Sequence, residues 1–207
     1  MIDSKQFWND VYEKKNEKKP SYDLWLEDYK EVLNKCSVPV IDLGCGTGGD
    51  TLYLTERGHK VIACDQSQEA LNIINSFIPQ VKTIQMDISK PLPFEDESAE
   101  VIIADLSLHY FNHETTQNIV KEIKRVLKNK GYLLGRVNSI NDFNFGAGSG
   151  EEIERNFYLT QDGNKRFFSE EDIKNYFQNF SIEVCEEKSV LKYGKEKRAF
   201  EFVVRNM

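Results

Sequence analysis

Short apolar runs alternate along the chain with stretches in which apolar residues recur three and four positions apart. Ser67 can cap one of these helical stretches, and Pro79 ends it, while Gly58 and Gly131 follow two others. Strand–helix alternation of this kind is typical of a parallel sheet covered by helices. The runs expected to form buried strands are residues 38–43, 60–65, 81–86, 100–105 and 132–137.

After the fifth predicted strand the pattern changes. Residues 138–150 read as a long polar, glycine-rich loop, and Asp162–Gly163 predicts a hairpin turn. We therefore expect residues 138–168 to form a loop and hairpin insert over a substrate site. The two short segments joined by the turn are 157–159 and 166–168.

The C-terminal part returns to regular elements. Ser169 to Asp172 form a capping box that opens a further helix. Two last strands, at about 181–187 and 199–204, are close enough in sequence to pair antiparallel. The predicted fold is α/β: a doubly wound, mostly parallel seven-stranded sheet with one antiparallel strand near the C-terminus and helices on both faces.

The first 36 residues carry two amphipathic helical patterns. One includes Phe7, Trp8 and Tyr12, and the other runs from Trp25 to Cys36. Helices that precede the first strand have no crossover to make, so they either cover one face of the sheet or wall a site at its edge. We predict a single domain over residues 1–207, with residues 1–36 as an N-terminal helical lid.

Composition narrows the class of protein. The 207 residues include 34 acidic and 27 basic side chains, and the net charge of −7 disfavours nucleic acid as the main partner. No apolar run is long enough to span a membrane, and the N-terminus lacks an apolar signal core, so we expect a cytoplasmic protein without a membrane partner. The pattern specifies no oligomeric state. The scattered cysteines, expected to be reduced thiols, are Cys36, Cys45, Cys64 and Cys185.

The most informative segment runs from Val38 to Asp50, where an apolar strand breaks into four glycines within six residues. Such a loop lets a ligand approach the main chain closely, and the helix that follows offers free N–H groups. Gly44, Gly46 and Gly49 also satisfy the dinucleotide-binding fingerprint, so the glycines alone do not identify the ligand.

Two carboxylates refine this interpretation. Asp42 lies in the strand before the first glycine, where a negative charge favours a cationic ligand over a phosphate. Asp65 ends the next strand, about twenty residues after the first glycine, where an acidic side chain can hold two ribose hydroxyls. A cofactor that has a ribose and a positive charge but no phosphate matches both features, which indicates S-adenosylmethionine.

The segments 42–49 and 61–65 read DLGCGTGG and VIACD, and they resemble motifs one and two of the class I S-adenosylmethionine-dependent methyltransferases. The resemblance runs from about Phe7 to the C-terminus. It implies that Asp42 holds the methionine ammonium, although Asp42 can also bond the N–H groups of its own loop. It also implies that Asp87 accepts from the adenine amino group. The implied cofactor contacts are Asp42, Gly44, Cys45, Gly46, Asp65, Gln66, Asp87, Ile88, Asp105 and Leu106.

The fourth motif bears on the methyl acceptor. It begins at Asp105 and reads DLSL, without the prolines of the family members that methylate exocyclic amines. This departure argues against an enzyme that methylates nucleic-acid bases. The acidic charge, the lid-like N-terminus and the hairpin insert favour a small-molecule acceptor, and the chain is similar to the small stand-alone enzymes grouped with the thiopurine and tellurite-resistance methyltransferases. The alternatives are a protein or RNA acceptor, a nicotinamide-dependent oxidoreductase, and a non-catalytic cofactor-binding protein.

Candidate acceptor-site residues follow the fourth strand and lie in the insert. His109 is the candidate general base, although it can also be a packed, hydrogen-bonded histidine. His113 lies four residues later, but no third ligand is near, so no metal is expected. Arg136 and Arg166 can hold an anionic group of the acceptor or form salt bridges. The aromatic residues that either wall the pocket or pack in the core are Tyr12, Trp25, Tyr110 and Tyr158.

Overall fold

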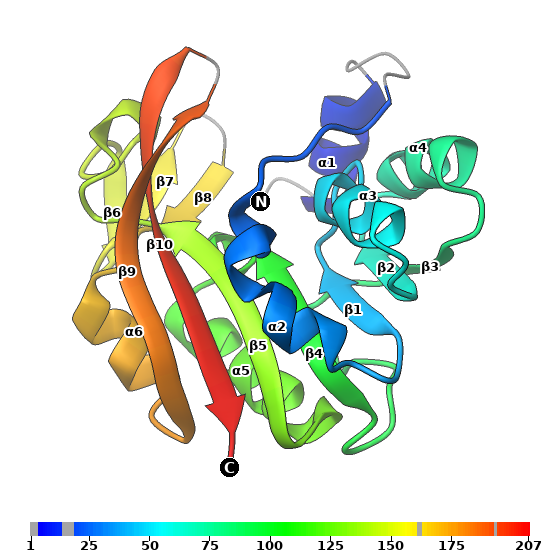
Figure 1. The fold of residues 1–207 in the computed structure, drawn as a ribbon. Coiled ribbons are helices and arrows are strands. Elements are labelled where there is room, and N and C mark those ends of the chain that lie inside the picture. The colour runs from blue at the N-terminus through cyan, green and yellow to red at the C-terminus, as the bar shows by residue number, and fades with distance from the viewer. Residues whose placement is uncertain (1–3, 14–18, 161–162, 193) are drawn as a thin grey trace.

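A seven-stranded sheet forms the centre of the protein (Figure 1). The computed structural model describes residues 4–13, 19–160, 163–192 and 194–207. The spatial order of the strands is β3-β2-β1-β4-β5-β10-β9. Their bounds are β1 (Val40–Leu43), β2 (Val61–Asp65), β3 (Lys82–Gln85), β4 (Ala99–Asp105), β5 (Leu127–Asn138), β9 (Phe180–Lys192) and β10 (Lys195–Asn206).

The strand directions confirm the predicted fold. The first five strands are parallel, and β10 runs antiparallel to both of its neighbours, β5 and β9. β9 and β10 extend well beyond the predicted segments because they form one long hairpin that pairs from Phe180–Asn206 to Lys192–Lys195. The hairpin closes the sheet at one edge.

Alternate strand residues point into two separate cores, one on each face. Ile41 and Leu133 belong to the core that includes α5 (His113–Val126) and α6 (Glu170–Tyr176). Val40 and Leu134 belong to the core formed with α2 (Lys30–Asn34), α3 (Gly49–Glu56) and α4 (Gln68–Phe77). Because both faces are covered, the strands are apolar without alternation, as expected for a doubly wound sheet. Figure 1 shows α2 and α3 on the side opposite α5.

Local signals place the helix ends. The Ser67 hydroxyl accepts from the N–H of Ala70 at the start of α4, and Ser169 and Asp172 form the predicted capping box at the start of α6. Each cap satisfies N–H groups that the helix itself cannot. No helix among the described residues is long and apolar enough to cross a membrane.

The N-terminal segment differs in part from its prediction. α1 (Ser4–Glu13) forms as expected. The second predicted helix is a 3-10 helix, η1 (Trp25–Tyr29), followed by the short α2. The buried side chains of Trp25, Leu26 and Leu33 hold it against the sheet.

The insert is a three-stranded antiparallel sheet rather than a two-stranded hairpin. Its strands are β6 (Glu151–Glu154), β7 (Phe157–Thr160) and β8 (Gly163–Arg166). β6 was not predicted because its sequence is mostly acidic, and the strand predicted at 166–168 was wrong because β8 ends at Arg166. Of the predicted Asp162–Gly163 turn, Asp162 lies outside the described residues.

Candidate active site

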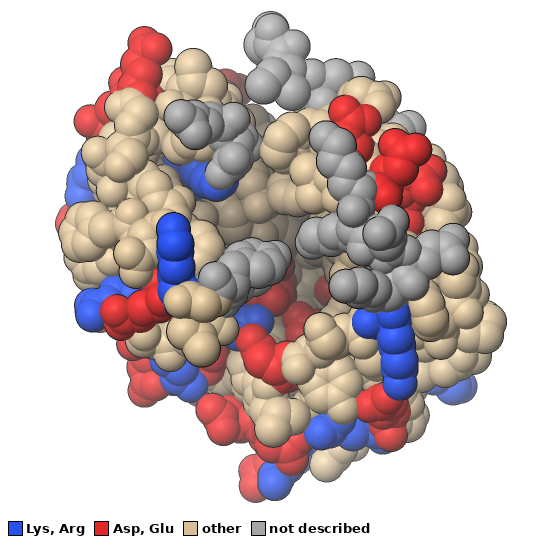
Figure 2. All heavy atoms as spheres, turned by 90° about the horizontal axis from the view of Figure 1, so that it is seen from above, with Lys and Arg blue, Asp and Glu red and all other residues tan. Residues whose placement is uncertain are grey.

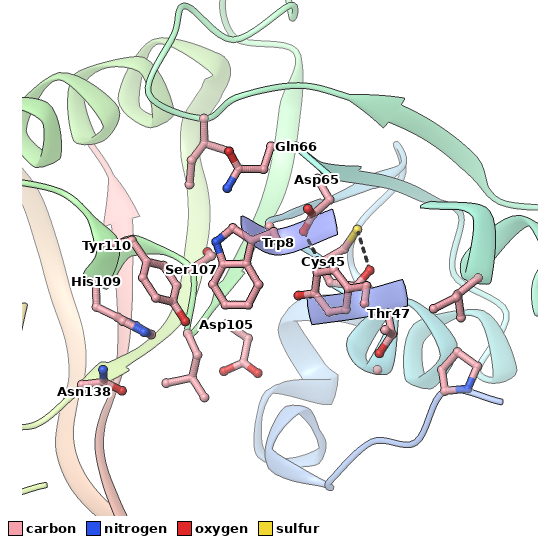
Figure 3. Close-up of a pocket in the computed structure, with 18 of the residues that line it drawn as sticks. Trp8, Cys45, Thr47, Asp65, Gln66, Asp105, Ser107, His109, Tyr110 and Asn138 are labelled. Carbon is pink, nitrogen blue, oxygen red and sulfur yellow. Dashed lines mark hydrogen bonds between the residues drawn. The ribbon is translucent and has the colours of Figure 1, made fainter. Parts of the chain in front are cut away.

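A cleft of about 940 Å³ opens at the carboxyl ends of β1, β2 and β4. β1 lies between β2 and β4. After β1 the chain adds β2 and β3 on one side of it and then crosses to add β4 and β5 on the other side, so the strand order reverses at β1. Ligands of open α/β sheets bind at this kind of switch point. Figure 2 shows the hollow from above, and Figure 3 shows residues that line it. All of the predicted cofactor contacts except Asp42 line this cleft.

The glycine loop after β1 packs closely against the loop after β4. Gly44 has a φ of +71°, and a Cβ at this position would lie 2.4 Å from the Cβ of Ser107. The N–H groups of Gly44 and Cys45 both donate to the carbonyl of Cys64, at 2.8 and 3.0 Å. These hydrogen bonds fix the loop to β2, and Gly44, Cys45 and Gly46 of the loop line the cleft.

Asp65 joins the end of β2 to this loop. Its Oδ2 accepts from the N–H of Gly46 at 2.9 Å, and its Oδ1 accepts from the N–H of Ser67 at 2.8 Å. Burial raises the pKa of the carboxyl group, and the backbone donors oppose that rise. A carboxylate can accept about four hydrogen bonds, so Asp65 retains capacity to accept from a ligand in the cleft.

Asp42 lies beneath the loop rather than in the cleft lining. It is 1% exposed, and its Oδ2 accepts from the Thr51 hydroxyl at 2.6 Å. Its pKa is raised to about 7, with burial as the largest cause; the charges of Asp105 and Asp65 also raise the pKa, and the Thr51 hydrogen bond opposes the rise. Asp42 therefore has a structural role in part, because it accepts a hydrogen bond from Thr51 just after its own loop. When Asp42 is ionised, its charge can still attract a cation in the cleft, because little water lies between them to screen it.

A second buried carboxylate, Asp50, lies at the start of α3. Its Oδ1 accepts from the indole N–H of Trp25 at 2.9 Å. Burial first, and then the charges of Asp105 and Asp42, raise its pKa well above the usual range. Three buried carboxylates, Asp42, Asp50 and Asp65, therefore lie under and beside the glycine loop, and the charge of Asp105 acts on Asp42 and Asp50.

Asp105 is tied to Arg136 by two hydrogen bonds. Arg136 Nε and Nη2 lie 2.6 and 2.8 Å from the two carboxylate oxygens, and Nη1 lies 2.8 Å from Asp23. The guanidinium also lies 4.7 Å from the centre of the Trp25 ring. These contacts correspond to the salt-bridge alternative for Arg136, and neither Arg136 nor Trp25 lines the cleft.

The outer cofactor positions carry fewer internal contacts. Asp87 is exposed, and its Oδ1 accepts from the N–H of Ser89 at 2.9 Å. Ile88 is buried, and Gln66, which follows β2, lines the cleft together with Asp87 and Ile88. Leu106, directly after β4, has a φ of +50°, and its N–H donates to the carbonyl of Arg136. A positive φ in a branched residue is strained, which is common at ligand sites.

The other half of the cleft is aromatic. His109 is buried in η2 (Leu108–Tyr110), with its ring 4.2 Å from that of Tyr110. Trp8 of α1 meets Tyr110 edge to face at 5.1 Å and stacks on Tyr12 at 5.6 Å. Asn9 accepts from the Ser67 hydroxyl at 2.7 Å, which fixes α1 to the start of α4.

Two further predicted acceptor residues lie outside the lining. Arg166 is buried and donates to Glu154 and to the carbonyls of Phe111 and Arg155, so it holds the small sheet to η2. Tyr158 packs against Phe167. His113 meets the Tyr176 hydroxyl at 2.8 Å, and the described residues contain no group of His, Cys, Asp or Glu that could hold a metal.

Sequence reasoning missed Trp8, Phe145, Lys165 and Lys197, all of which line the cleft. Lys197 is the most informative of them. It lies in β10 two residues before Ala199, which pairs with Asn138 at the end of β5. Lys197 lines the cleft because of the register in which β10 pairs with β5. No local sequence signal specifies that register.

The strand order and directions define a doubly wound, Rossmann-like α/β protein with a cleft at the switch point of the sheet. Residues 40–131 match the family described as a methyltransferase domain. The sheet and this match support a class I S-adenosylmethionine-dependent methyltransferase, a family whose cofactor is S-adenosylmethionine.

Relatives and a solved structure agree with this assignment. The uncharacterized methyltransferase sll0829 of Synechocystis sp. is 33% identical over 92 residues, which cover 44% of this chain and 43% of that protein. The tRNA N(3)-methylcytidine methyltransferase Mettl2 of Drosophila melanogaster is 30% identical over 148 residues, which cover 65% and 46%. The chain thus spans less than half the length of these curated relatives.

One similar structure is that of 1,6-didemethyltoxoflavin-N1-methyltransferase from Burkholderia thailandensis, with bound 1,6-didemethyltoxoflavin and S-adenosylhomocysteine. The TM-score is 0.65 at 17% identity, over 99% of this chain and 80% of that one. At this identity the likeness shows a common fold.

Proposed function

We propose that the protein transfers a methyl group from S-adenosylmethionine to a small-molecule acceptor. The observation that carries the proposal is one cleft with two different halves. Asp65 and the glycine loop form one half, and His109 with the aromatic side chains of α1 and η2 forms the other. When bound, S-adenosylmethionine supplies an electrophilic methyl group that an in-line displacement can move to the acceptor.

Three features of the first half support this cofactor. Asp65 can accept from two ribose hydroxyls in addition to its backbone donors. Gly44 allows the backbone to pass where a side chain would collide with Ser107. Ser107 Oγ is buried and has no hydrogen-bond partner among the described residues, and Ser107 lines the same half, so a bound ligand can satisfy its hydroxyl.

The carboxylates under the loop favour a cationic ligand. In this proposal Asp42 acts on the methionine ammonium through its field or through water. Asp105 and Leu106 border the same region, and Cys45 lies in the loop itself. The adenine end is assigned to the outer positions, where Gln66, Asp87 and Ile88 line the cleft.

The second half positions the acceptor and keeps water out. Trp8, Tyr12 and Tyr110 form one wall of this half. In this proposal residues 1–36 act as a lid, and residues 138–168 act as an insert over the same site of a single domain. His109 is the proposed base. If the attacking atom carries a proton, the imidazole accepts it while that atom bonds to the methyl carbon. Methyl transfer otherwise depends mainly on alignment, which can supply much of the acceleration.

RNA is the second candidate acceptor because one relative is named as a tRNA methyltransferase. The net charge of −7 and the wall formed by α1 favour the small molecule. An assay with labelled S-adenosylmethionine, offered a metabolite extract or a tRNA pool, separates the two. Label in tRNA alone would overturn the small-molecule assignment.

Cofactor binding tests the class. We expect S-adenosylhomocysteine to raise the melting temperature of the protein, and NAD to leave it unchanged. Stabilisation by NAD without stabilisation by S-adenosylhomocysteine would favour an oxidoreductase. Tight cofactor binding with no transfer to either pool would favour a non-catalytic binding protein.

A further inference from the structure

Charged groups divide along the cleft. The carboxylates in the lining are Asp65, Asp87 and Asp105; Asp65 and Asp105 end strands β2 and β4, and Asp87 lies just after β3. The second half carries the amines of Lys165 from β8 and Lys197 from β10, and no described carboxylate lines it. Lys19 also lines the cleft, but it lies beside α3, 3.6 Å from Glu56. The acceptor half therefore presents positive rather than negative groups to a ligand.

Lys197 is built into the floor of this half. Its side chain is buried, and Nζ lies 2.7 Å from Asn138 Oδ1 and 2.9 Å from Asp142 Oδ2. Asp142 does not line the cleft and also accepts from the N–H of Arg198. The counter-ion thus sits behind the ammonium and stabilises its charge, while Lys197 itself faces the cleft.

The same contact orients Asn138. Because its Oδ1 accepts from Lys197, its amide nitrogen is the group left to serve a ligand. Asn138 is 2% exposed and lines the cleft beside His109 (Figure 3). An amide N–H and an ammonium side by side form a donor pair, which matches two acceptor oxygens such as those of a carboxylate.

Aromatic rings line the same cleft as this donor pair. The centre of the Phe145 ring lies 4.6 Å from Lys197 Nζ, and Trp8 and Tyr110, which also line the cleft, meet edge to face. Flat faces of this kind favour a planar molecule. The carboxylate end of such a molecule would lie at Asn138 and Lys197, and its other end would extend toward the cofactor half.

We propose that the methyl acceptor is a flat organic acid, anchored by its carboxylate to Asn138 and Lys197. This inference rests on the proposed function and adds the chemical class of the substrate. Methyl transfer itself forms a bond from the acceptor atom to the methyl carbon, and the sulfur keeps the electron pair of the broken S–C bond. The anchoring carboxylate takes no part in that exchange.

The test uses the whole protein saturated with S-adenosylhomocysteine and two probes of the same shape, 4-hydroxybenzoate and 4-hydroxybenzamide. Calorimetric titration should show that the carboxylate binds at least tenfold more tightly than the amide. Equal binding of the two probes, or binding of neither, would refute the inference. Failure of S-adenosylhomocysteine itself to bind would instead refute the proposed function.

Variants locate the anchor. Lys197→Met leaves Asp142 buried without its partner, so the double variant Lys197→Met/Asp142→Asn removes both charges of the pair. In the double variant the preference for the carboxylate should fall to about equal binding, while the affinity for S-adenosylhomocysteine stays the same. Lys197→Arg should retain part of the preference. Lys121→Met, on the exposed face of α5, is the control and should change neither affinity. A preference that survives in the double variant would overturn the assignment.

Discussion

Replacing Asp42 by asparagine should stabilise the ligand-free protein at pH 8. The carboxyl group is fully buried, and burial is the largest cause of its raised pKa, which lies at about 7. Its hydrogen bond from Thr51 only partly offsets the cost of burying the charge. Asparagine has nearly the same shape, can still accept from Thr51, and carries no charge at any pH.

The sign of the effect follows from linkage. A carboxyl group whose pKa rises from 3.8 in the unfolded chain to about 7 in the folded protein contributes stability that is complete below about pH 4. That contribution is lost as pH rises toward 7, and the loss amounts to roughly 4 kcal/mol at about 1.36 kcal/mol per pH unit. For a chain of this size the corresponding shift in melting temperature is on the order of 10 °C.

Urea unfolding of the ligand-free wild type and of Asp42→Asn at pH 5 and pH 8 measures the effect. The stability advantage of the variant should grow by roughly 3 kcal/mol between the two pH values. Asp87→Asn, at an exposed carboxylate of the same cleft, should change stability little. If Asp42→Asn were less stable than the wild type by the same amount at both pH values, the argument from buried charge would be wrong. The variant should also lose affinity for both S-adenosylmethionine and S-adenosylhomocysteine, because both carry the methionine ammonium.

Three further substitutions test other parts of the site. Asp65→Ala should weaken S-adenosylhomocysteine binding at least 100-fold by calorimetry, because two hydrogen bonds to a charged group contribute about 1.5–3 kcal/mol each; near-normal affinity would contradict the ribose assignment. His109→Ala should slow methyl transfer without changing cofactor affinity, and equal rates would leave His109 a structural residue. Arg136→Met should cost about 1–3 kcal/mol of unfolding free energy, because Asp105 loses its two-point partner; Asp23 is half exposed and adds little. Arg136→Met/Asp105→Asn should recover part of that cost, and a double variant no more stable than the single one would argue against the ion pair.

The parts of the fold that were predictable depend on local signals. The strand–glycine–strand pattern from Val40 to Asp65 and the caps at Ser67 and Ser169 are each specified within a few residues, and all of them formed as expected. β6 was missed because three of its four residues are glutamates, which gives no apolar alternation. Its pairing with β7 is a tertiary contact that overrides weak local propensity.

The site, like the fold, divides into a part that local sequence signals predict and a part that depends on tertiary contacts. The cofactor half is built from residues near strand ends in a regular fold, so their convergence could be predicted from topology. The acceptor half depends on the pairing register of β10 with β5 and on where α1 packs. Sequence alone showed that Arg136 leaves β5 at the right edge, but its choice between a ligand and Asp105 is decided by side-chain geometry in three dimensions.

The buried acids also bear on which cofactor the glycine loop can serve. Arg136 pairs with Asp105 and Asp23, whereas no lysine or arginine among the described residues forms an ion pair with Asp42 or Asp50. Buried carboxylates without a counter-ion destabilise the ligand-free protein, and a bound cation removes that cost. A pyrophosphate at the same place would add like charge to the cluster and increase it. The carboxylates beneath the loop, more than the glycines in it, therefore distinguish a sulfonium nucleoside from a nicotinamide dinucleotide.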